Sequence, residues 1–381
     1  MDDPSERIRQ DLRRIEPSRG AFERTLRRVR RRQRNRRLGA GAIGAFLTVG
    51  LATGLWTSLH LERSPGESPS PTPDQAPADD RLVLAGDGEL WVVDVATASA
   101  QRFEMPELSP GDPPHRIVRR GGKLVAWGYE TLVLDPDSVS RPSVLTPDSL
   151  IFIPSALRDR VWVGIPAPEN AETACLQAVR EITVEGVVTV PDTKPPGCRW
   201  PVAAVVEGLA FQTADGAMEV WDPRSREIVR TLAGAFPLAW QGHLLAWCGD
   251  PCEEVHLTDF STGTEQTIRP PEGIVSLQGY EGAFSPDGST LALVGLTVRD
   301  LDQARAQLVV VDVASGEAEA VRGAIVPPGY HFVDWSPSGG SVFITGGERF
   351  EERQLVEYAT GDGIVRTVPA DVGDFYDLAV I

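Results

Sequence analysis

The sequence is poor in the residues from which metal and nucleophilic centres are usually built. Its 381 residues include five His, four Cys and three Met, and no two His stand at the H-x-x-x-H or H-E-x-x-H spacing of metal-binding helices. It also has no G-x-S-x-G nucleophile elbow and no Gly-rich phosphate loop. We therefore expect neither a metal nor a cofactor, and none of the enzyme classes that depend on these motifs.

Lysine and asparagine are nearly missing as well. Lys123 and Lys194 stand against 35 Arg, and Asn occurs only at Asn35 and Asn170. This usage is typical of a GC-rich bacterial genome, so it favours an actinobacterial host.

Charge and hydropathy divide the chain at one apolar segment. Residues 38–61 have no charged side chain apart from His60, and they are long enough for a helix across a hydrocarbon core of about 30 Å. Residues 1–37 hold 14 Arg against six acidic residues, a net of +8, whereas the remaining 23 basic and 48 acidic residues give −25. The positive-inside rule then predicts a single transmembrane helix with a basic cytoplasmic tail and an extracytoplasmic body. So acidic a body is unsuited to nucleic acid.

Two other interpretations of the apolar segment fit less well. A cleaved signal peptide has a shorter charged region and a small-residue cleavage site, and no A-x-A directly follows the apolar segment here. A buried core helix does not suit a Gly-rich segment followed by the five Pro of residues 62–80, which predict an extended stalk. The Arg-rich tail and its apolar periodicity suit an anionic membrane surface or a docking partner. A topogenic signal with incidental periodicity is the alternative.

A four-strand pattern recurs through residues 81–381. The 264 residues from Asp94 to Tyr358 span six intervals between copies of its third strand, a mean of 44, which is typical of four-stranded blades. The copies of this strand are residues 90–94, 132–135, 179–183, 218–222, 255–259, 308–312 and 355–358. The chain is therefore predicted to be all-β beyond the stalk, as a seven-bladed β-propeller.

Two turns between the first and second strands of a blade have the clearest motif. They read Phe284-Ser-Pro-Asp-Gly288 and Trp335-Ser-Pro-Ser-Gly339, each between two apolar strands. This pattern resembles the WD40-like repeats of TolB-type bacterial propellers, and the resemblance implies the fold without implying a ligand. The order of tail, anchor, Pro-rich stalk and propeller is similar to that of single-pass membrane proteins of actinobacteria. The eukaryotic WD40 pattern, which has Gly-His ahead of each blade, is not followed. Gly242-His243 falls at the turn between the first and second strands of a blade.

The two ends of the repeat region should complete one blade. Residues 81–103 supply only the second, third and fourth strands, and residues 375–381 supply one unmatched apolar strand. Pairing them would close the ring and remove the exposed sheet edges of an open propeller.

Antiparallel strand order sorts the connections between two faces. If the strands of a blade are A to D, the A–B and C–D turns lie on one face and the B–C and D–A loops on the other. The turns of the first set are short, for example at residues 120–122, 261–263 and 361–363, and we call their side the short-turn face. The second set, the long-loop face, comprises residues 104–114, 166–174, 191–199, 269–279, 297–306, 322–329 and 346–353. Loops concentrate binding residues, so the long-loop face is the predicted binding face; simple tolerance of insertions is the alternative.

All four cysteines map to the long-loop face. Cys248 and Cys252 bracket a B–C turn of blade 5, and Cys175 and Cys198 lie in loops of blade 3. An even number of Cys in an extracytoplasmic domain indicates disulfides, and Cys175–Cys198 with Cys248–Cys252 is the local pairing among three possibilities. A metal site of four thiolates is the alternative, but no C-x-x-C or nearby His supports it.

Five acidic residues of the long loops are candidates to contact a cation or a basic partner, although solvated loop charges are the simpler interpretation. They are Asp250, Glu253, Glu254, Asp300 and Asp302.

The first functional hypothesis is a non-catalytic extracytoplasmic module that binds a protein or a small ligand. One alternative is a transmembrane regulator of the anti-sigma type, although residues 1–37 have no Cys or His for a zinc motif. The other is a propeller lyase or glycosidase with carboxylates in the central channel, which sequence spacing cannot exclude. Carboxylates converging in the channel would favour the enzyme.

Overall fold

The computed structural model describes most of the chain from Asp80 onward. The described residues are 80–86, 89–105, 116–127, 131–146, 151–166, 176–197, 199–213, 216–232, 236–249, 252–298, 305–327, 329–347, 353–369, 372 and 375–381. The predicted cytoplasmic tail and membrane helix, and residues 62–79 of the predicted stalk, lie outside them. No helix within the described ranges combines the length and the hydropathy needed to cross a membrane.

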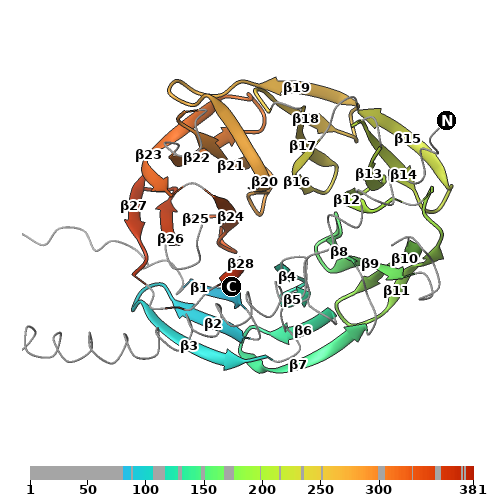
Figure 1. Cartoon of the computed structure of the whole chain (residues 1–381), viewed down its shortest axis with the longest axis horizontal. Coiled ribbons are helices and arrows are strands. Elements are labelled where there is room, and N and C mark those ends of the chain that lie inside the picture. The colour runs from blue at the N-terminus through green and yellow to red at the C-terminus, as the bar shows by residue number, and fades with distance from the viewer. Residues whose placement is uncertain are drawn as a thin grey trace, which may run out of the picture. The chain divides into compact units, whose positions relative to one another are not determined.

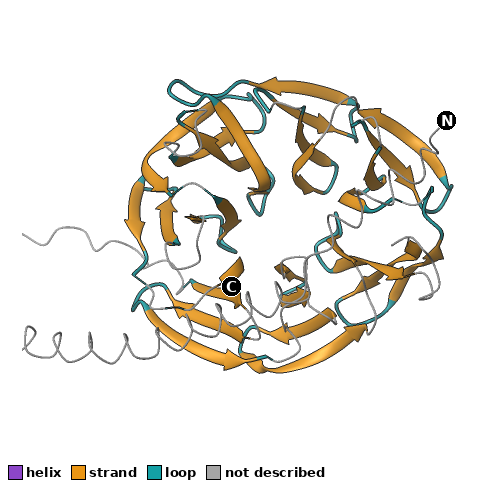
Figure 2. Cartoon of the chain, viewed as in Figure 1, coloured by secondary structure: helices purple, strands orange, loops and turns teal. Residues whose placement is uncertain are grey.

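The described residues form 28 strands in seven four-stranded antiparallel sheets arranged around a centre (Figure 1). Each sheet is one blade, with strand A nearest the centre and strand D outermost, and turns and loops make the connections (Figure 2). The seven inner strands that surround the central channel are β28, β4, β8, β12, β16, β20 and β24. The predicted seven-bladed β-propeller is therefore confirmed.

The strand bounds follow, blade by blade and from strand A to strand D. Blades 1 and 2 are β28 (Phe375–Val380), β1 (Arg81–Gly86), β2 (Glu89–Asp94) and β3 (Ser99–Glu104), then β4 (Arg116–Arg120), β5 (Lys123–Trp127), β6 (Thr131–Asp135) and β7 (Ser138–Thr146). Blades 3 and 4 are β8 (Ile151–Pro154), β9 (Arg160–Pro166), β10 (Leu176–Thr183) and β11 (Val188–Thr193), then β12 (Pro201–Val205), β13 (Gly208–Gln212), β14 (Met218–Asp222) and β15 (Glu227–Leu232). Blade 5 is β16 (Phe236–Gln241), β17 (Leu244–Cys248), β18 (Val255–Asp259) and β19 (Thr264–Ile268). Blades 6 and 7 are β20 (Ser276–Phe284), β21 (Thr290–Leu296), β22 (Ala306–Asp312) and β23 (Ala318–Val326), then β24 (Tyr330–Trp335), β25 (Ser341–Gly347), β26 (Gln354–Ala359) and β27 (Ile364–Thr367).

An Asp at the last position of strand C ends the strand in most blades. All seven segments predicted for this strand fall in the third strand of a blade. In five of these strands the final Asp accepts hydrogen bonds from backbone N–H groups of the following turn, as when Thr97 N donates to Asp94 at 2.7 Å. The five residues are Asp94, Asp135, Asp222, Asp259 and Asp312. The side chain thus starts the C–D turn as it closes the strand, and these hydrogen bonds lower the pKa of Asp94.

The two Ser-Pro turns are structural elements with a shared hydrogen-bond pattern. Ser285 N donates to Thr290 O at 2.8 Å, and Thr290 N donates to Ser285 Oγ at 2.9 Å. Ser336 and Ser341 repeat both bonds, each at 2.9 Å. Ser285 Oγ also donates to the Asp287 carboxylate at 2.6 Å, which with the bonds from Ser289 lowers the pKa of Asp287 to about 2. The motif therefore fixes the A–B connection.

The predicted closure of the ring by the chain's last strand is confirmed. β28 is strand A of blade 1 and pairs with β1, in register from Leu82 opposite Val380 to Gly86 opposite Phe375. Beyond the strand, Arg81 and Ile381 exchange two backbone hydrogen bonds of 2.8 and 3.1 Å. No open sheet edge is left between blades 7 and 2.

Apolar side chains pack between neighbouring blades and hold the ring together. One such cluster joins blades 3 and 4: Trp162 and Leu176 pack with Phe211 and Trp221, all of them buried. Phe211 and Trp221 meet edge to face, with ring centroids 5.9 Å apart. Four of the described tryptophans, Trp162, Trp221, Trp247 and Trp335, are thus buried packing residues, whereas Trp200 is exposed.

All seven loops predicted for the long-loop face begin or end within a strand, and two of them overlap a strand the most. Of residues 269–279, those from Ser276 onward belong to β20, and of residues 322–329, those up to Val326 belong to β23. The register shifts in both strands. In β20 the shift lies between Gln278 and Ala283. In β23 it lies opposite the segment of β22 between Gln307 and Val309. These bulges absorb the extra residues within the sheet, which the period of the sequence does not reveal.

Candidate functional site

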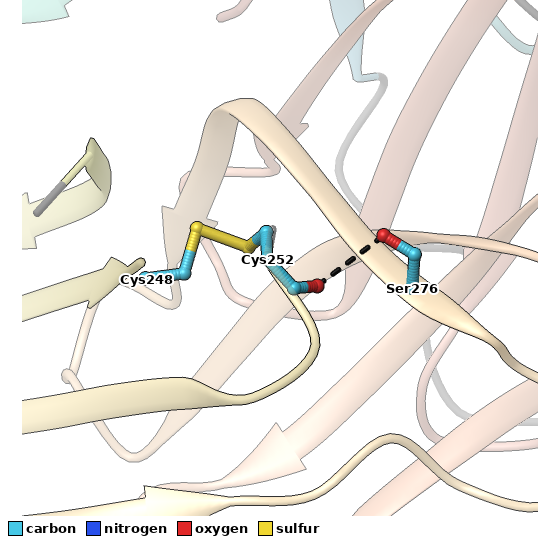
Figure 3. Close-up of a disulfide and its surroundings, with 3 residues drawn as sticks. All are labelled: Cys248, Cys252 and Ser276. Atoms are coloured by element: carbon cyan, nitrogen blue, oxygen red, sulfur yellow. Dashed lines mark hydrogen bonds between the residues drawn. A yellow bond between two sulfur atoms is a disulfide. The ribbon is translucent and has the colours of Figure 1, made fainter. Parts of the chain in front are cut away.

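A disulfide fixes one corner of the long-loop face. Cys248 at the end of β17 is bonded to Cys252 in the B–C loop of blade 5, with a Cα–Cα distance of 5.2 Å, so this predicted pair is confirmed. The Cys252 carbonyl accepts hydrogen bonds from Ser276 Oγ (Figure 3) and Leu277 N, both at 3.2 Å. The loop is therefore tied to β20 of blade 6, and closing so short a loop stabilises the fold by about 2 kcal/mol in the chain-entropy model.

Charged side chains stand beside this disulfide. Glu253 and Glu254 are exposed, and Glu254 makes an exposed ion pair with Arg269 at 3.7 Å. With four neighbouring residues they line an open hollow of about 570 Å³. Its lining is Gly249, Glu253, Glu254, His256, Arg269, Pro270 and Ile274. Two carboxylates thus directly follow Cys252, whose carbonyl is anchored to β20.

The other predicted site residues lie outside the described residues. They are Asp250, Asp300, Asp302, Cys175 and Cys198. Of the predicted set, the structure brings together Glu253, Glu254 and the Cys248–Cys252 pair. In the part of the chain that is described, no three His, Cys, Asp or Glu side chains are grouped so that they could hold a metal ion.

A second hollow, which the sequence did not predict, lies in the central channel. Its volume is about 420 Å³, and it is lined by the inner strands of blades 1, 2, 3, 5, 6 and 7 and the turns that follow them. Strand A runs from the long-loop face to the short-turn face, and most of the lining comes from the last residues of strand A and the A–B turn, such as Arg120 and Trp240. The cavity therefore occupies the short-turn end of the channel.

Two tryptophans stiffen the wall of this channel cavity. Trp335 Nε1 donates to the Ala283 carbonyl of blade 6, and Trp240 Nε1 of blade 5 donates to the Pro154 carbonyl of blade 3, both at 2.9 Å. Each bond joins inner strands of different blades, so the wall is held by its own hydrogen bonds.

The two carboxylates of the channel cavity hold neighbouring inner strands together. Asp334 of β24 accepts from Val380 N of β28 at 2.9 Å and from Trp335 N at 2.8 Å. Asp377 of β28 accepts from Ile117 N of β4 and from Leu378 N, both at 2.8 Å. Burial raises the pKa of Asp334, and these amides partly offset the effect. Both groups therefore serve to link blades 7, 1 and 2.

Three arginines line the same cavity. Arg119 and Arg120 end β4, and Arg158 lies in the turn between β8 and β9. Arg120 Nη1 donates to the Arg119 carbonyl at 3.1 Å, while the buried Arg120 Nε has no hydrogen-bond partner. Burial lowers the pKa of Arg120 to about 10; the Asp334 carboxylate partly offsets this, and the charges of Arg158 and Arg119 add to the lowering. The guanidinium stays charged at neutral pH.

Asp80, which directly precedes β1 and lies near Arg119, should make the stability of the propeller depend on pH. Burial and the neighbouring Glu357 carboxylate raise the pKa of Asp80 to about 6. The folded state therefore holds this proton more tightly than the unfolded state, and stability is lost as pH rises from about 4 to about 6. Asp80→Asn should stabilise the protein at pH 7 by roughly 1 kcal/mol, because solvent screens this half-buried group, and raise Tm by about 2 °C.

Thermal unfolding at pH 4 and pH 7 measures the Asp80 effect. The gain should be much smaller at pH 4, where Asp80 is protonated in the folded state and partly protonated in the unfolded state, and the exposed Glu185→Gln should not change the profile. An Asp80→Asn variant less stable than the parent at pH 7 would contradict this account.

These features define a seven-bladed β-propeller with a charged cavity at one end of its channel. No family model matches the chain, and no curated protein matches it. Among solved structures, it is similar to apo AztD from Citrobacter koseri, with 12% identity, 79% of this chain and 98% of the other covered, and a TM-score of 0.45. It is also similar to TolB from Acinetobacter baumannii, with 14% identity, 79% of this chain and 66% of the other covered, and a TM-score of 0.43. Hsv2 from Kluyveromyces lactis is similar with 12% identity, 75% of this chain and 93% of the other covered, and a TM-score of 0.42. A TolB structure is thus among its neighbours, as the Ser-Pro turns suggested, but the propeller class rests on the chain's own seven sheets.

Proposed function

We propose that this chain is a non-catalytic binding module whose propeller is held outside a membrane by residues 38–61. Its long-loop face recognises a protein or a small ligand, and the corner of that face next to the Cys248–Cys252 loop is the first contact. The anionic side chains of Glu253 and Glu254 suit a basic group on the partner.

The observation that carries this proposal is the disulfide and its anchoring. A disulfide is typical of proteins in an oxidising compartment, which supports an extracytoplasmic propeller. The hydrogen bonds from Ser276 and Leu277 to the Cys252 carbonyl hold the loop before any partner arrives. A loop already fixed loses little conformational entropy on binding, as a recognition surface requires.

The channel gives less support to a lyase or glycosidase. Both described carboxylates of the cavity, Asp334 and Asp377, accept hydrogen bonds from backbone amides of adjacent inner strands. A glycosidase needs one carboxyl group to donate a proton and another to attack or to activate water. Groups that also join blades are poorly suited to either role.

Site-specific photo-crosslinking in intact cells tests the binding face. A photoreactive residue at Glu254, on the long-loop face, should give a discrete adduct with a partner protein or a defined mass increase from a ligand. The matched position is Asp362, exposed in the C–D turn of blade 7 on the short-turn face, where we expect no adduct. Equal labelling at both positions, or none at either, would refute a binding role for this face.

Protease added to intact cells tests the placement of the propeller. The full chain should stay with the membrane fraction and its propeller should be accessible to the enzyme, whereas a variant lacking residues 38–61 should be soluble and protected. An intact chain protected inside the cell would refute the extracytoplasmic part of the proposal without affecting the crosslinking result.

A further inference from the structure

The arginines of the channel cavity are not explained by the fold. Asp334 and Asp377 link neighbouring inner strands, and Trp240 and Trp335 stiffen the wall. No described carboxylate makes an ion pair with Arg119, Arg120 or Arg158. The Asp334 carboxylate attracts Arg119 and Arg120, but it accepts backbone N–H groups of Val380 and Trp335 instead of pairing with either guanidinium. The buried Nε of Arg120 therefore keeps a hydrogen-bond donor that no group of the described chain accepts, and such a donor calls for a partner.

We propose that the short-turn end of the channel is an anion-binding site, in which Arg119, Arg120 and Arg158 hold the phosphate or carboxylate group of a small ligand. The site lies at the opposite end of the channel from the long-loop face and does not depend on the function proposed for that face. Its three guanidinium groups come from two neighbouring blades, so the packing of blade 2 against blade 3 is what brings them together.

The unused donors of the cavity fit an oxyanion. A guanidinium has five N–H donors in a planar fork that matches phosphate and carboxylate oxygens. Arg120 uses Nη1 on a backbone carbonyl and leaves its Nε buried without a partner. Arg158 is exposed at the mouth, where it can reach an arriving ligand. The volume of about 420 Å³ is that of a small-ligand site, large enough for an anionic metabolite and too small for a folded domain.

The distribution of charge also favours an anion inside the cavity over an anion on the surrounding surface. The chain is strongly acidic, with a formal net charge of −17, so its surface repels anions in general. Inside the cavity three Arg face two Asp, and each Asp already accepts two backbone N–H groups. Asp80 lies near Arg119 but is not part of the lining. The arginine cluster is thus a local positive site within a negative body.

Calorimetric titration of the purified full chain with inorganic phosphate, and separately with citrate, tests the proposal at constant ionic strength. We expect saturable binding of at least one of the two, which also tells whether a phosphate or a carboxylate is preferred. Arg120→Gln should weaken that binding by roughly tenfold or more, since it removes a charged hydrogen-bond donor. Arg120→Lys should retain part of it, because the charge stays and the planar donor fork is lost.

Two further variants keep the result interpretable. Arg158→Gln removes an exposed group that folding does not need, and it should also weaken binding. Arg224→Gln makes the same change at an exposed position on the short-turn face outside the cavity, and it should bind like the parent. Arg120→Gln without ligand should still melt cooperatively and close to the parent, because removing a desolvated charge offsets the lost attraction to Asp334.

The proposal is overturned if neither anion binds at concentrations up to about 10 mM, an affinity too weak for a built site. It is equally overturned if Arg120→Gln and Arg158→Gln bind as well as Arg224→Gln, because the anion would then act on the surface in general.

Discussion

Deleting residues 375–381 should abolish folding of the propeller. This segment contains β28, the inner strand of blade 1, and buries Phe375, Leu378, Ala379 and Val380 almost completely. At about 1.5–3 kcal/mol for each large apolar side chain, the loss is comparable to the whole stability of an ordinary domain, about 5–15 kcal/mol. The truncated chain should therefore be insoluble or show no cooperative melting transition.

The same strand also links three blades, which makes its loss more than local. Asp377 accepts from Ile117 N of blade 2, and Val380 N donates to Asp334 of blade 7. Without β28, these groups lose their partners and β1 becomes an open edge. Both effects act on the ring as a whole.

Circular dichroism and thermal melting measure the effect of this truncation. Ile381→Ala, which keeps the two backbone bonds to Arg81, should lower Tm only slightly. A synthetic peptide of residues 372–381 added to the truncated chain during refolding should restore structure, because the missing strand then pairs in trans. A truncated chain that melts like the parent would show that the ring does not need closure.

The blades could be predicted because each one repeats a local pattern. An apolar run that ends in Asp, such as residues 308–312, specifies both the strand and the turn after it, because the Asp312 carboxylate binds the N–H of Ser315. The closing strand could be predicted for the same reason. Residues 81–103 supply only three strands of blade 1, and residues 375–381 supply one strand that belongs to no other blade. The Cys248–Cys252 pair followed from a loop too short for many alternatives.

The channel cavity could not be predicted because its residues converge only in three dimensions. Arg120 and Arg158 are far apart in the sequence, and no motif joins them; they meet because blades 2 and 3 are neighbours in the ring. Arg120-Gly121-Gly122 indicated only a tight turn, which the positive φ of Gly121 and Gly122 confirms. The one available signal was two charged residues at the end of an inner strand, where the channel lies. Channel carboxylates were predicted, whereas the channel arginines were not.

Phe211→Ala should cost about 3–5 kcal/mol, because the substitution empties the centre of the cluster between blades 3 and 4. Phe211 has no exposed surface, and its ring meets Trp221 edge to face, a contact that adds about 0.5–1.5 kcal/mol to area burial. Trp162 and Leu176 of blade 3 are too tightly packed to collapse fully into the space. Phe211→Leu keeps most of the volume and should lose much less.

Chemical denaturation of the Phe211 variants tests whether stability resides between the blades. Ile228→Ala removes a side chain of similar apolar character from β15 of the same blade, but Ile228 is 42% exposed, so the change should stay within about 0.5 kcal/mol. Equal losses for Phe211→Ala and Ile228→Ala would mean that each sheet is stable by itself. The expected difference would mean that a blade is stable only with its neighbour, which is why the ring must close before either the long-loop face or the channel cavity can exist.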